Sequence, residues 1–175
     1  MAEQKTNVMR LLSQKKISYT PHEYPHGPEA LDGLTVAGII GAAPEQVFKT
    51  LVTRGASKSI HVFVIPVAEE LDLKKAARAA GEKSIAMIHV NELLSVTGYV
   101  RGGCSPVGMK KQYDTLYHES ALRQETIIVS AGKIGFQVEL KPEELIKLTG
   151  GKTAKLIVEA VSYTHLRAHE TLSDL

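Results

Sequence analysis

One stretch of the chain combines residue types that can hold an anion or a carbonyl oxygen. From Thr97 to Lys111 it reads TGYVRGGCSPVGMKK and contains four glycines, a proline and the only cysteine. The pair Gly102–Gly103 lets backbone N–H groups approach a ligand where a Cβ would clash. Arg101 and Lys110–Lys111 add positive charge. A glycine-rich loop is also an ordinary turn, so partners elsewhere must decide between the two readings.

Two side chains are candidates for chemistry at such a loop. Cys104 would be a nucleophile if nearby cations lowered the pKa of its thiol, but a free cysteine is more often an inert small hydrophobe. Lys49, in the segment QVFKTL, is flanked by apolar residues, and an inward-facing ammonium there would bind a phosphate, carbonyl or ester oxygen. The alternative is a lysine on the solvent face of an alternating strand. The pattern alone favours that alternative.

Motifs of common enzyme classes are missing from the sequence. It has no Gly-x-Ser-x-Gly elbow, no paired cysteines, no Walker loop and no Gly-x-Gly-x-x-Gly. The histidines of the segment HEYPH, residues 22–26, do not by themselves indicate a metal site. The missing motifs therefore remove the commonest hydrolase, zinc and nucleotide-binding readings, and we predict no metal site.

Two groups of cations could together form a surface that binds the phosphates of a nucleic-acid backbone. One group is Lys74, Lys75 and Arg78 in a predicted helix, and the other is Arg101 with Lys110–Lys111. The alternative is two separate solvated faces. The net charge of +2 is too small to choose between them.

The elements that position these residues follow from periodicity and end signals. We predict helices over Thr6–Lys16, Thr35–Ile40, Leu71–Ala80, Val90–Val96 and Pro142–Leu148. We predict strands over Ile17–Tyr24, Ile60–Val67, Ser84–Ile88, Thr115–His118, Thr126–Ser130 and Gly135–Leu140, with Pro44–Val52 passing from a helical turn into a strand. Several strands follow one another after residue 112, which favours a single α+β domain with a mixed sheet, curled into a barrel.

Composition and length bound the class of protein. The chain has 175 residues, 43% of them hydrophobic and 23% charged, as in a globular domain. No apolar run is long enough to span a membrane, and a lone cysteine forms no internal disulfide, so we expect a cytoplasmic protein without membrane contact. The segment SYTHLRAHETLSDL at the end has weak periodicity. We predict a domain over residues 1–160 and a non-native or disordered tail over residues 161–175.

Four segments in this order and spacing resemble the YbaK/EbsC family. They are VFKTL at Val47–Leu51, PVAEELDLKKAARAAG at Pro66–Gly81, TGYVRGGCSPVGMKK at Thr97–Lys111 and VSAGKIGFQVEL at Val129–Leu140. The resemblance implies a Cys-tRNA(Pro) deacylase, related to the editing domain of bacterial prolyl-tRNA synthetases and needing no cofactor. In that mechanism the thiol of the substrate attacks its own ester, so the enzyme supplies only orientation, oxyanion stabilisation and proton handling.

The resemblance also assigns roles to individual residues. Lys49 matches the essential lysine that holds the tRNA terminus and the ester, and Thr50 follows it as in the family. Gly102–Gly103 match the loop whose N–H groups would face the carbonyl. Ser130 matches a pocket serine, and Tyr24 matches a tyrosine near the N-terminus. Cys104 has no role in the family mechanism.

One position departs from the family pattern. Gln137 stands where the best-studied branch has an aspartate, and an amide cannot act as an acid–base group. Three readings therefore stay open beside Cys-tRNA(Pro) deacylation: an Ala-tRNA(Pro) deacylase, a non-catalytic tRNA- or synthetase-binding module, and a Cys104-dependent thiol enzyme. The expected partners are the acceptor end of tRNA(Pro) and prolyl-tRNA synthetase, which could supply tRNA selectivity that the free module lacks.

Overall fold

The computed structural model describes residues 5–27 and 30–159. Its helices are α1 (Asn7–Gln14), α2 (Gly33–Ile40), α3 (Leu73–Ala80), α4 (Val90–Thr97) and α5 (Pro142–Thr149), with a 3-10 helix η1 (Glu119–Arg123). Its strands are β1 (Thr20–Glu23), β2 (Phe48–Gly55), β3 (Ile60–Pro66), β4 (Ile85–Met87), β5 (Asp114–His118), β6 (Ile127–Ser130), β7 (Phe136–Leu140) and β8 (Lys152–Ala154). The tail predicted over residues 161–175 lies outside the described residues.

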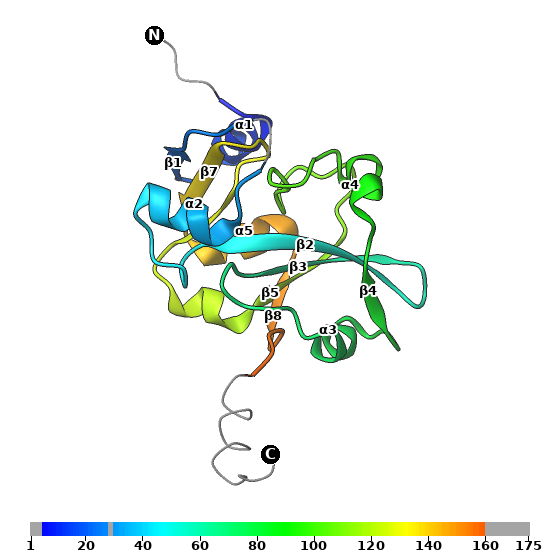
Figure 1. Cartoon of the computed structure of the whole chain (residues 1–175). Coiled ribbons are helices and arrows are strands. Elements are labelled where there is room, and N and C mark those ends of the chain that lie inside the picture. Colours follow the sequence, from blue (N-terminus) through cyan, green and yellow to red (C-terminus); the bar gives the residue numbers. More distant parts are fainter. Residues whose placement is uncertain (1–4, 28–29, 160–175) are drawn as a thin grey trace, which may run out of the picture.

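The strands form two sheets (Figure 1). The larger sheet has the order β4-β2-β3-β5-β8, antiparallel around β2 and parallel where β5 joins β3 and β8. The smaller sheet has the order β1-β7-β6 and is antiparallel throughout. The predicted α+β class with mixed strand directions is therefore confirmed.

The predicted barrel is not supported by the strand pairing of the described residues. One isolated parallel bridge, between Val47 and Ile128, joins the two sheets, and the Ile128 N–H donates to the carbonyl of Gln46 at 2.9 Å. The outer strands β1 and β8 pair with β7 and β5 and not with each other. Periodicity predicts individual strands, but closure depends on which distant edges meet, and no local pattern specifies that.

Local signals account for the helix ends, although α2 begins at Gly33 and not at the predicted Thr35, and α3 begins at Leu73 and not at Leu71. Thr6 caps α1 by accepting a hydrogen bond from the Met9 N–H, and Asp72 caps α3 by accepting from two N–H groups. Gly41 ends α2 with a φ of 75°, a conformation that glycine adopts without strain. Two short elements, η1 and β8, were not predicted, because segments of three to five residues carry too little periodicity.

The apolar strand β3, which the sequence predicts over Ile60–Val67, is the centre of the larger sheet. Its residues 62–65 are fully buried, and its two faces contribute to different core clusters. Val62 and Val64 pack toward α1, β6 and β7, while Phe63 and Ile65 pack toward α3. In Figure 1, α1 and α2 lie near the smaller sheet and α3 lies near β8 at the other end. No helix in the described ranges is long and apolar enough to cross a membrane.

Candidate functional site

A cavity of about 120 Å³ lies where β2, β6, β7, the start of α2 and the glycine-rich loop (residues 98–113) meet. Its wall contains all but one of the residues singled out from the sequence: Tyr24, Lys49, Thr50, Gly102, Ser130 and Gln137. Two other cavities, of about 300 Å³ and 220 Å³, contain none of these residues. The fold therefore gathers candidates from five separate segments into one small site.

Strand β2 presents an unpaired edge to this cavity. Val47 accepts a hydrogen bond from Val67 at 2.8 Å on the β3 side, so alternate residues of β2 bond to β3 and the residues between them face the other edge. On that edge β6 reaches β2 only through the bridge at Val47, and β4 begins opposite Thr53. The backbone polar groups of Thr50 therefore face a gap between β6 and β4, and both Phe48 and Thr50 line the cavity.

Lys49 brings a partly desolvated positive charge to the cavity. It is half-buried, and burial lowers the pKa of its ammonium, while the carboxylates of Glu70 and Glu69 act in the opposite direction. Among the described residues its Nζ makes no hydrogen bond and no ion pair. The cation is thus free to bind an oxygen of a ligand. The sequence pattern favoured a Lys49 side chain on the solvent face of the strand, but in the structure Lys49 is half-buried and lines the cavity.

Two enclosed polar atoms of the cavity residues lack a hydrogen-bond partner within the described structure. They are Thr50 Oγ1 and Gln137 Oε1. A buried polar group left unpaired costs about 1–3 kcal/mol. A ligand that donates hydrogen bonds to this pair would remove that cost, so these atoms indicate a polar ligand.

The β6–β7 hairpin and β1 place three further residues of the wall. Ser130 and Gln137 lie opposite each other in the β6–β7 pairing. The Oγ of Ser130 accepts a hydrogen bond from the Gly132 N–H at 3.2 Å, which leaves the hydroxyl proton available to a ligand. Tyr24 follows β1 and is buried, and its N–H donates to the carbonyl of Gly135 at 2.9 Å.

The two glycines of the loop differ in position. Gly102 lines the cavity with a φ of 89°, and its N–H has no acceptor among the described residues. Gly103 is not part of the wall, and its N–H donates to the carbonyl of Val100 at 2.9 Å within the turn. A Cβ added at Gly103 would lie 3.2 Å from the Cα of Lys133. Gly102 is thus the available donor, and Gly103 allows close packing of two loops.

Cys104 lines the cavity as an un-ionised thiol. Burial raises its pKa to about 12, and a hydrogen bond with Thr97 only partly offsets this effect. Almost no thiolate exists at neutral pH, so the side chain contributes an apolar surface and not a nucleophile.

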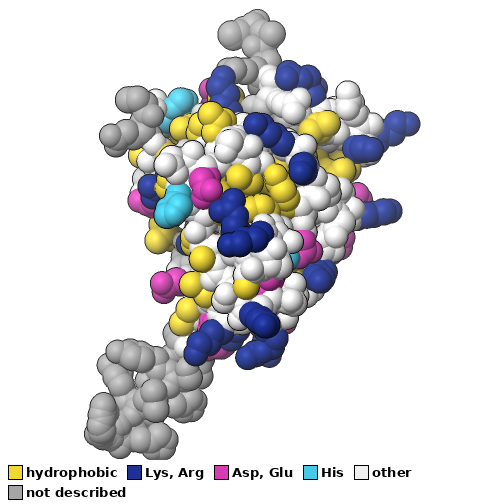
Figure 2. All heavy atoms as spheres, turned by 90° about the vertical axis from the view of Figure 1, so that its right-hand side faces the viewer, with side chains coloured by type: hydrophobic (Ala, Val, Ile, Leu, Met, Phe, Trp, Pro, Cys, Tyr) yellow, Lys and Arg dark blue, Asp and Glu magenta, His cyan; other side chains and the backbone are white. Residues whose placement is uncertain are grey.

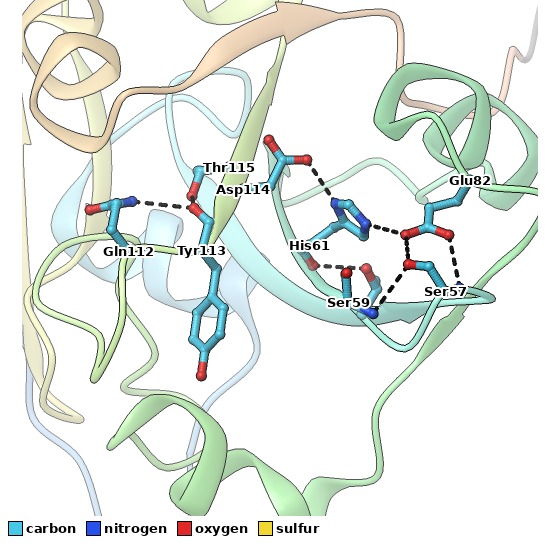
Figure 3. Close-up of polar contacts among 9 residues, drawn as sticks. Ser57, Ser59, His61, Glu82, Gln112, Tyr113, Asp114 and Thr115 are labelled. Atoms are coloured by element: carbon cyan, nitrogen blue, oxygen red, sulfur yellow. Dashed lines mark hydrogen bonds and ion pairs between the residues drawn. The ribbon is translucent and has the colours of Figure 1, made fainter.

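The structure also contains a serine, a histidine and two acids that could be mistaken for a catalytic triad (Figure 3). His61 Nδ1 is 2.7 Å from Asp114 Oδ2, and its Nε2 is 2.6 Å from Glu82 Oε2. Ser57 donates through its hydroxyl to Glu82 at 2.6 Å and not to the histidine. With both ring nitrogens on carboxylates, the imidazole cannot take a proton from Ser57. The cluster ties the β2–β3 hairpin to the end of α3 and to β5.

Sequence reasoning missed the apolar half of the site. Leu31, Val36 and Val67 line the cavity beside the polar residues. The start of α2 reaches this position because Gly33 lies against Val67, where a Cβ would be 2.5 Å from the Val67 Cγ1. The sequence could have predicted where α2 begins, because the side chain of the N-cap residue Asp32 accepts a hydrogen bond from the Thr35 N–H. An N-cap residue does not predict which part of the protein the helix packs against.

Comparison with known proteins places the chain among editing proteins. Residues 29–148 match the family described as the aminoacyl-tRNA editing domain. A protein of Enterococcus faecalis (strain ATCC 700802 / V583), provisionally named Cys-tRNA(Pro)/Cys-tRNA(Cys) deacylase EbsC, is 47% identical over 154 residues, which cover 88% of this chain and 94% of that protein. The uncharacterized protein YwhH of Bacillus subtilis (strain 168) is 28% identical over 116 residues, which cover 66% of this chain and 73% of that protein.

A solved structure shows the same fold. It is described as a candidate trans-editing enzyme for prolyl-tRNA synthetase, and it aligns with a TM-score of 0.76 at 24% identity over 90% of this chain and all of that one. The family match spans well over half of the chain, and the 47% identical relative is matched along most of both sequences. The chain therefore belongs to the aminoacyl-tRNA editing domain family.

Proposed function

We propose that this protein is a free-standing deacylase that hydrolyses the ester of mischarged aminoacyl-tRNA, with Cys-tRNA(Pro) as its leading substrate. The observation that carries the proposal is the small cavity in which an unpaired lysine, a free loop N–H and two unsatisfied polar atoms meet. Family membership and the name of the Enterococcus faecalis relative support this substrate class. Cysteine is close to proline in size, and binding alone separates such side chains by only about 10–200-fold, so a second site is needed to remove the error.

Lys49 is proposed to hold the tRNA terminus and the reacting ester. Its ammonium has no protein partner in the described structure, and its partial burial strengthens any bond to a ligand oxygen. Because Glu69 and Glu70 lie near enough to favour the charged form, the side chain can remain an ammonium at neutral pH.

Backbone donors are proposed to stabilise the oxyanion that forms at the ester carbon. The N–H of Gly102 is unpaired among the described residues, and the open β2 edge offers a further backbone N–H group at Thr50. Donors that are fixed before the reaction need no reorganisation in the transition state. Gly103 does not take this role in the proposal, because its N–H is bonded to Val100.

The nucleophile is proposed to be the thiol of the substrate. Its sulfur attacks the ester carbonyl carbon, the bond from that carbon to the ribose oxygen breaks, and the ribose oxygen takes up a proton. The products are a cyclic thiolactone, which water then opens, and deacylated tRNA. This route is consistent with a protein that offers no nucleophile of its own. Cys104 is un-ionised, and both ring nitrogens of His61 are hydrogen-bonded to carboxylates. The enzyme then contributes orientation and charge stabilisation.

Thr50, Ser130, Tyr24 and Gln137 are proposed to recognise the aminoacyl group. Gln137 Oε1 is a buried acceptor without a partner, so it suits a donor on the substrate. As an amide it cannot exchange protons, which also supports a second candidate, a non-catalytic module that binds tRNA or prolyl-tRNA synthetase. Tight binding of tRNA(Pro) or of the synthetase without turnover would favour the second candidate.

A substrate panel tests the proposal. Deacylation of purified Cys-tRNA(Pro), Ala-tRNA(Pro) and Cys-tRNA(Cys) would be followed under single-turnover conditions with the native protein. We expect Cys-tRNA(Pro) to be hydrolysed faster than the alanyl ester, because alanine lacks the thiol. Faster hydrolysis of Ala-tRNA(Pro) would move the protein to an alanine-editing role. Rates equal to buffer on all three esters would refute the deacylase proposal.

A further inference from the structure

The surroundings of the cavity are divided by charge. The segments 97–113 and 131–135 carry four cations and no aspartate or glutamate. These cations, which we call the basic rim, are Arg101, Lys110, Lys111 and Lys133, and all four are exposed. Figure 2 shows that Lys and Arg are spread over the face that carries α4, around a small hydrophobic patch.

Packing between loops brings the basic rim to the cavity. Arg101 directly precedes Gly102, which is part of the wall. The backbone of Lys133 lies against Gly103, where an added Cβ would be 3.2 Å from the Lys133 Cα. Lys110 donates through its N–H to the carbonyl of Thr97 at 3.1 Å. Arg101 and Lys133, from segments about 30 residues apart in the chain, are thus placed beside the cavity, and Lys110 and Lys111 lie further along the same glycine-rich loop.

The other side of the cavity is acidic. Glu70 and Glu69 lie close enough to Lys49 to raise the pKa of its ammonium against the effect of burial. Asp32 precedes α2, between Leu31 and Gly33 of the wall, and Gly33 packs against Val67, which precedes Glu69 and Glu70. A polyanion whose end occupies the cavity would be repelled on this side and attracted on the other.

The basic rim is not neutralised within the protein. The ion pairs of the described residues involve Arg54, Lys75 and two histidines, and none involves a rim residue. The ammonium of Lys133 lies 5.5 Å from the centroid of the Phe136 ring, a contact that leaves it open to a phosphate. The charges of the four cations are therefore not offset by ion pairs within the described residues.

We infer that the basic rim binds phosphates of the tRNA acceptor end, so that the RNA leaves the cavity across the glycine-rich loop and not across α2 and Glu69–Glu70. This inference rests on the proposed function, because it assumes that the 3′ end occupies the cavity. Each phosphate that a Lys or Arg neutralises releases counterions, so such binding weakens with salt by a slope of about 0.7–0.9 per phosphate. The cations of α3 take no part, because α3 lies beside β8 at the opposite end of the molecule (Figure 1).

Two matched variants test the inference. The rim variant carries R101Q, K110Q, K111Q and K133Q. The control variant carries R78Q, K74Q, K152Q and K155Q, which are exposed on α3, in β8 and just after it, and which remove the same charge. Each protein is assayed on Cys-tRNA(Pro) over a range of salt concentrations, on 3′-O-cysteinyl-adenosine as a minimal ester, and for binding of uncharged tRNA by fluorescence anisotropy.

For the rim variant we expect kcat/KM on Cys-tRNA(Pro) to fall at least about ten-fold at low salt, with the salt slope reduced by about 2 or more. Its kcat/KM on the minimal ester should equal that of the native protein, and the control variant should match the native protein on both esters. Equal tRNA kinetics and equal salt slopes for the rim and control variants would overturn the inference.

The same experiments distinguish failure of the proposed deacylase function from failure of the basic-rim inference. If the native protein hydrolyses neither ester, the deacylase proposal fails, and the anisotropy titrations still decide the inference. Weaker and less salt-dependent tRNA binding by the rim variant alone would support the basic rim. Identical tRNA binding by the two variants would contradict it.

Discussion

At the scale of single residues, the site is defined by polar groups that the protein leaves unpaired. Lys49, Thr50 and Gln137 contribute a cation and two buried atoms for which the described structure offers no partner. Folding normally satisfies such groups, so their convergence in one cavity indicates a ligand. Cys104, which its residue type alone would single out as reactive, has its thiol pKa raised by burial and is kept un-ionised.

Removal of the Lys49 charge should remove most of the activity. For Lys49→Ala we expect kcat/KM on Cys-tRNA(Pro) to fall by about 10²–10³, the usual effect of losing one charge-stabilising donor. Lys74→Ala, on the exposed face of α3, is the control and should have no effect. The measurement is single-turnover deacylation together with a urea denaturation curve. Full activity in Lys49→Ala would remove this residue from the site.

The pH profile should report the lysine as well. Burial lowers the pKa of Lys49 below its ordinary 10.5, so its charged form is lost at a lower pH than for a free lysine. We expect kcat/KM, after subtraction of spontaneous hydrolysis, to fall on the alkaline side below pH 10.5. In Lys49→Arg the alkaline fall should move to higher pH, because arginine stays charged. The same alkaline limb in both proteins would show that another group titrates.

Cys104 should resist alkylation. With a pKa raised to about 12 from 9.0, its thiolate fraction at neutral pH is about 1000-fold below that of an ordinary cysteine. We expect iodoacetamide to modify the native protein far more slowly than the protein in urea, as measured by intact mass. Rapid modification of the native protein with matching loss of activity would support the thiol-enzyme reading.

At the scale of elements, two loops and a gap in a strand pairing shape the cavity. The β2 edge is open because β6 and β4 contact it at opposite ends. The glycine-rich loop covers the gap, and Gly102 brings it next to the segment that leads into α2. The wall therefore depends on close approach at Gly102.

A side chain at Gly102 should displace the start of α2. In Gly102→Ala the new Cβ would lie 2.3 Å from the Cβ of Ala30, at a φ of 89°. We expect kcat/KM to fall more than ten-fold, because the cavity changes shape. The control is Gly41→Ala, which has a φ of 75° but open space around the Cβ, so it should cost about 1–2 kcal/mol in urea denaturation and leave activity intact. Equal activity in the two variants would contradict this account of the loop.

At the scale of the whole molecule, long-range polar contacts hold the elements in their relative positions. The His61 cluster joins the β2–β3 hairpin, the end of α3 and the start of β5. It lies away from the cavity, and none of its residues lines the wall. Its contribution is to stability and therefore depends on pH.

The acid stability of the fold should depend on Glu82. The hydrogen bond from the Ser57 hydroxyl, followed by that from His61, lowers the Glu82 pKa to about 2 from 4.5. A carboxyl whose pKa is lower in the folded state stabilises the fold above its ordinary pKa, and this stabilisation is lost as the pH falls from 4.5 toward 2. We expect the urea midpoint of the native protein to fall more steeply across this range than that of Glu82→Gln. Glu125→Gln, at an exposed loop position, should follow the native curve, and a Glu82→Gln curve of the same steepness would refute the assignment.

Much of the architecture followed from local physical chemistry. Cap residues such as Thr6 and Asp72, the glycine after α2 and the apolar run of β3 act over a few residues, so their elements could be predicted. The resemblance to a family supplied the candidate site residues, and the cavity contains all of them except Gly103. The barrel was not supported, since the meeting of distant strand edges has no local signal.

The sequence by itself determined the kinds of groups available and the elements that carry them. Only the tertiary structure decided which of those groups are free. The pattern around Lys49 favoured a solvent-facing lysine, and the fold makes it half-buried in a wall that distant segments such as β6, β7 and the glycine-rich loop complete. Gly102 and Gly103 are identical in sequence terms, but the turn uses the N–H of Gly103 and leaves that of Gly102 unpaired. Burial and hydrogen-bond pairing depend on long-range contacts, and those contacts exist only in the folded chain.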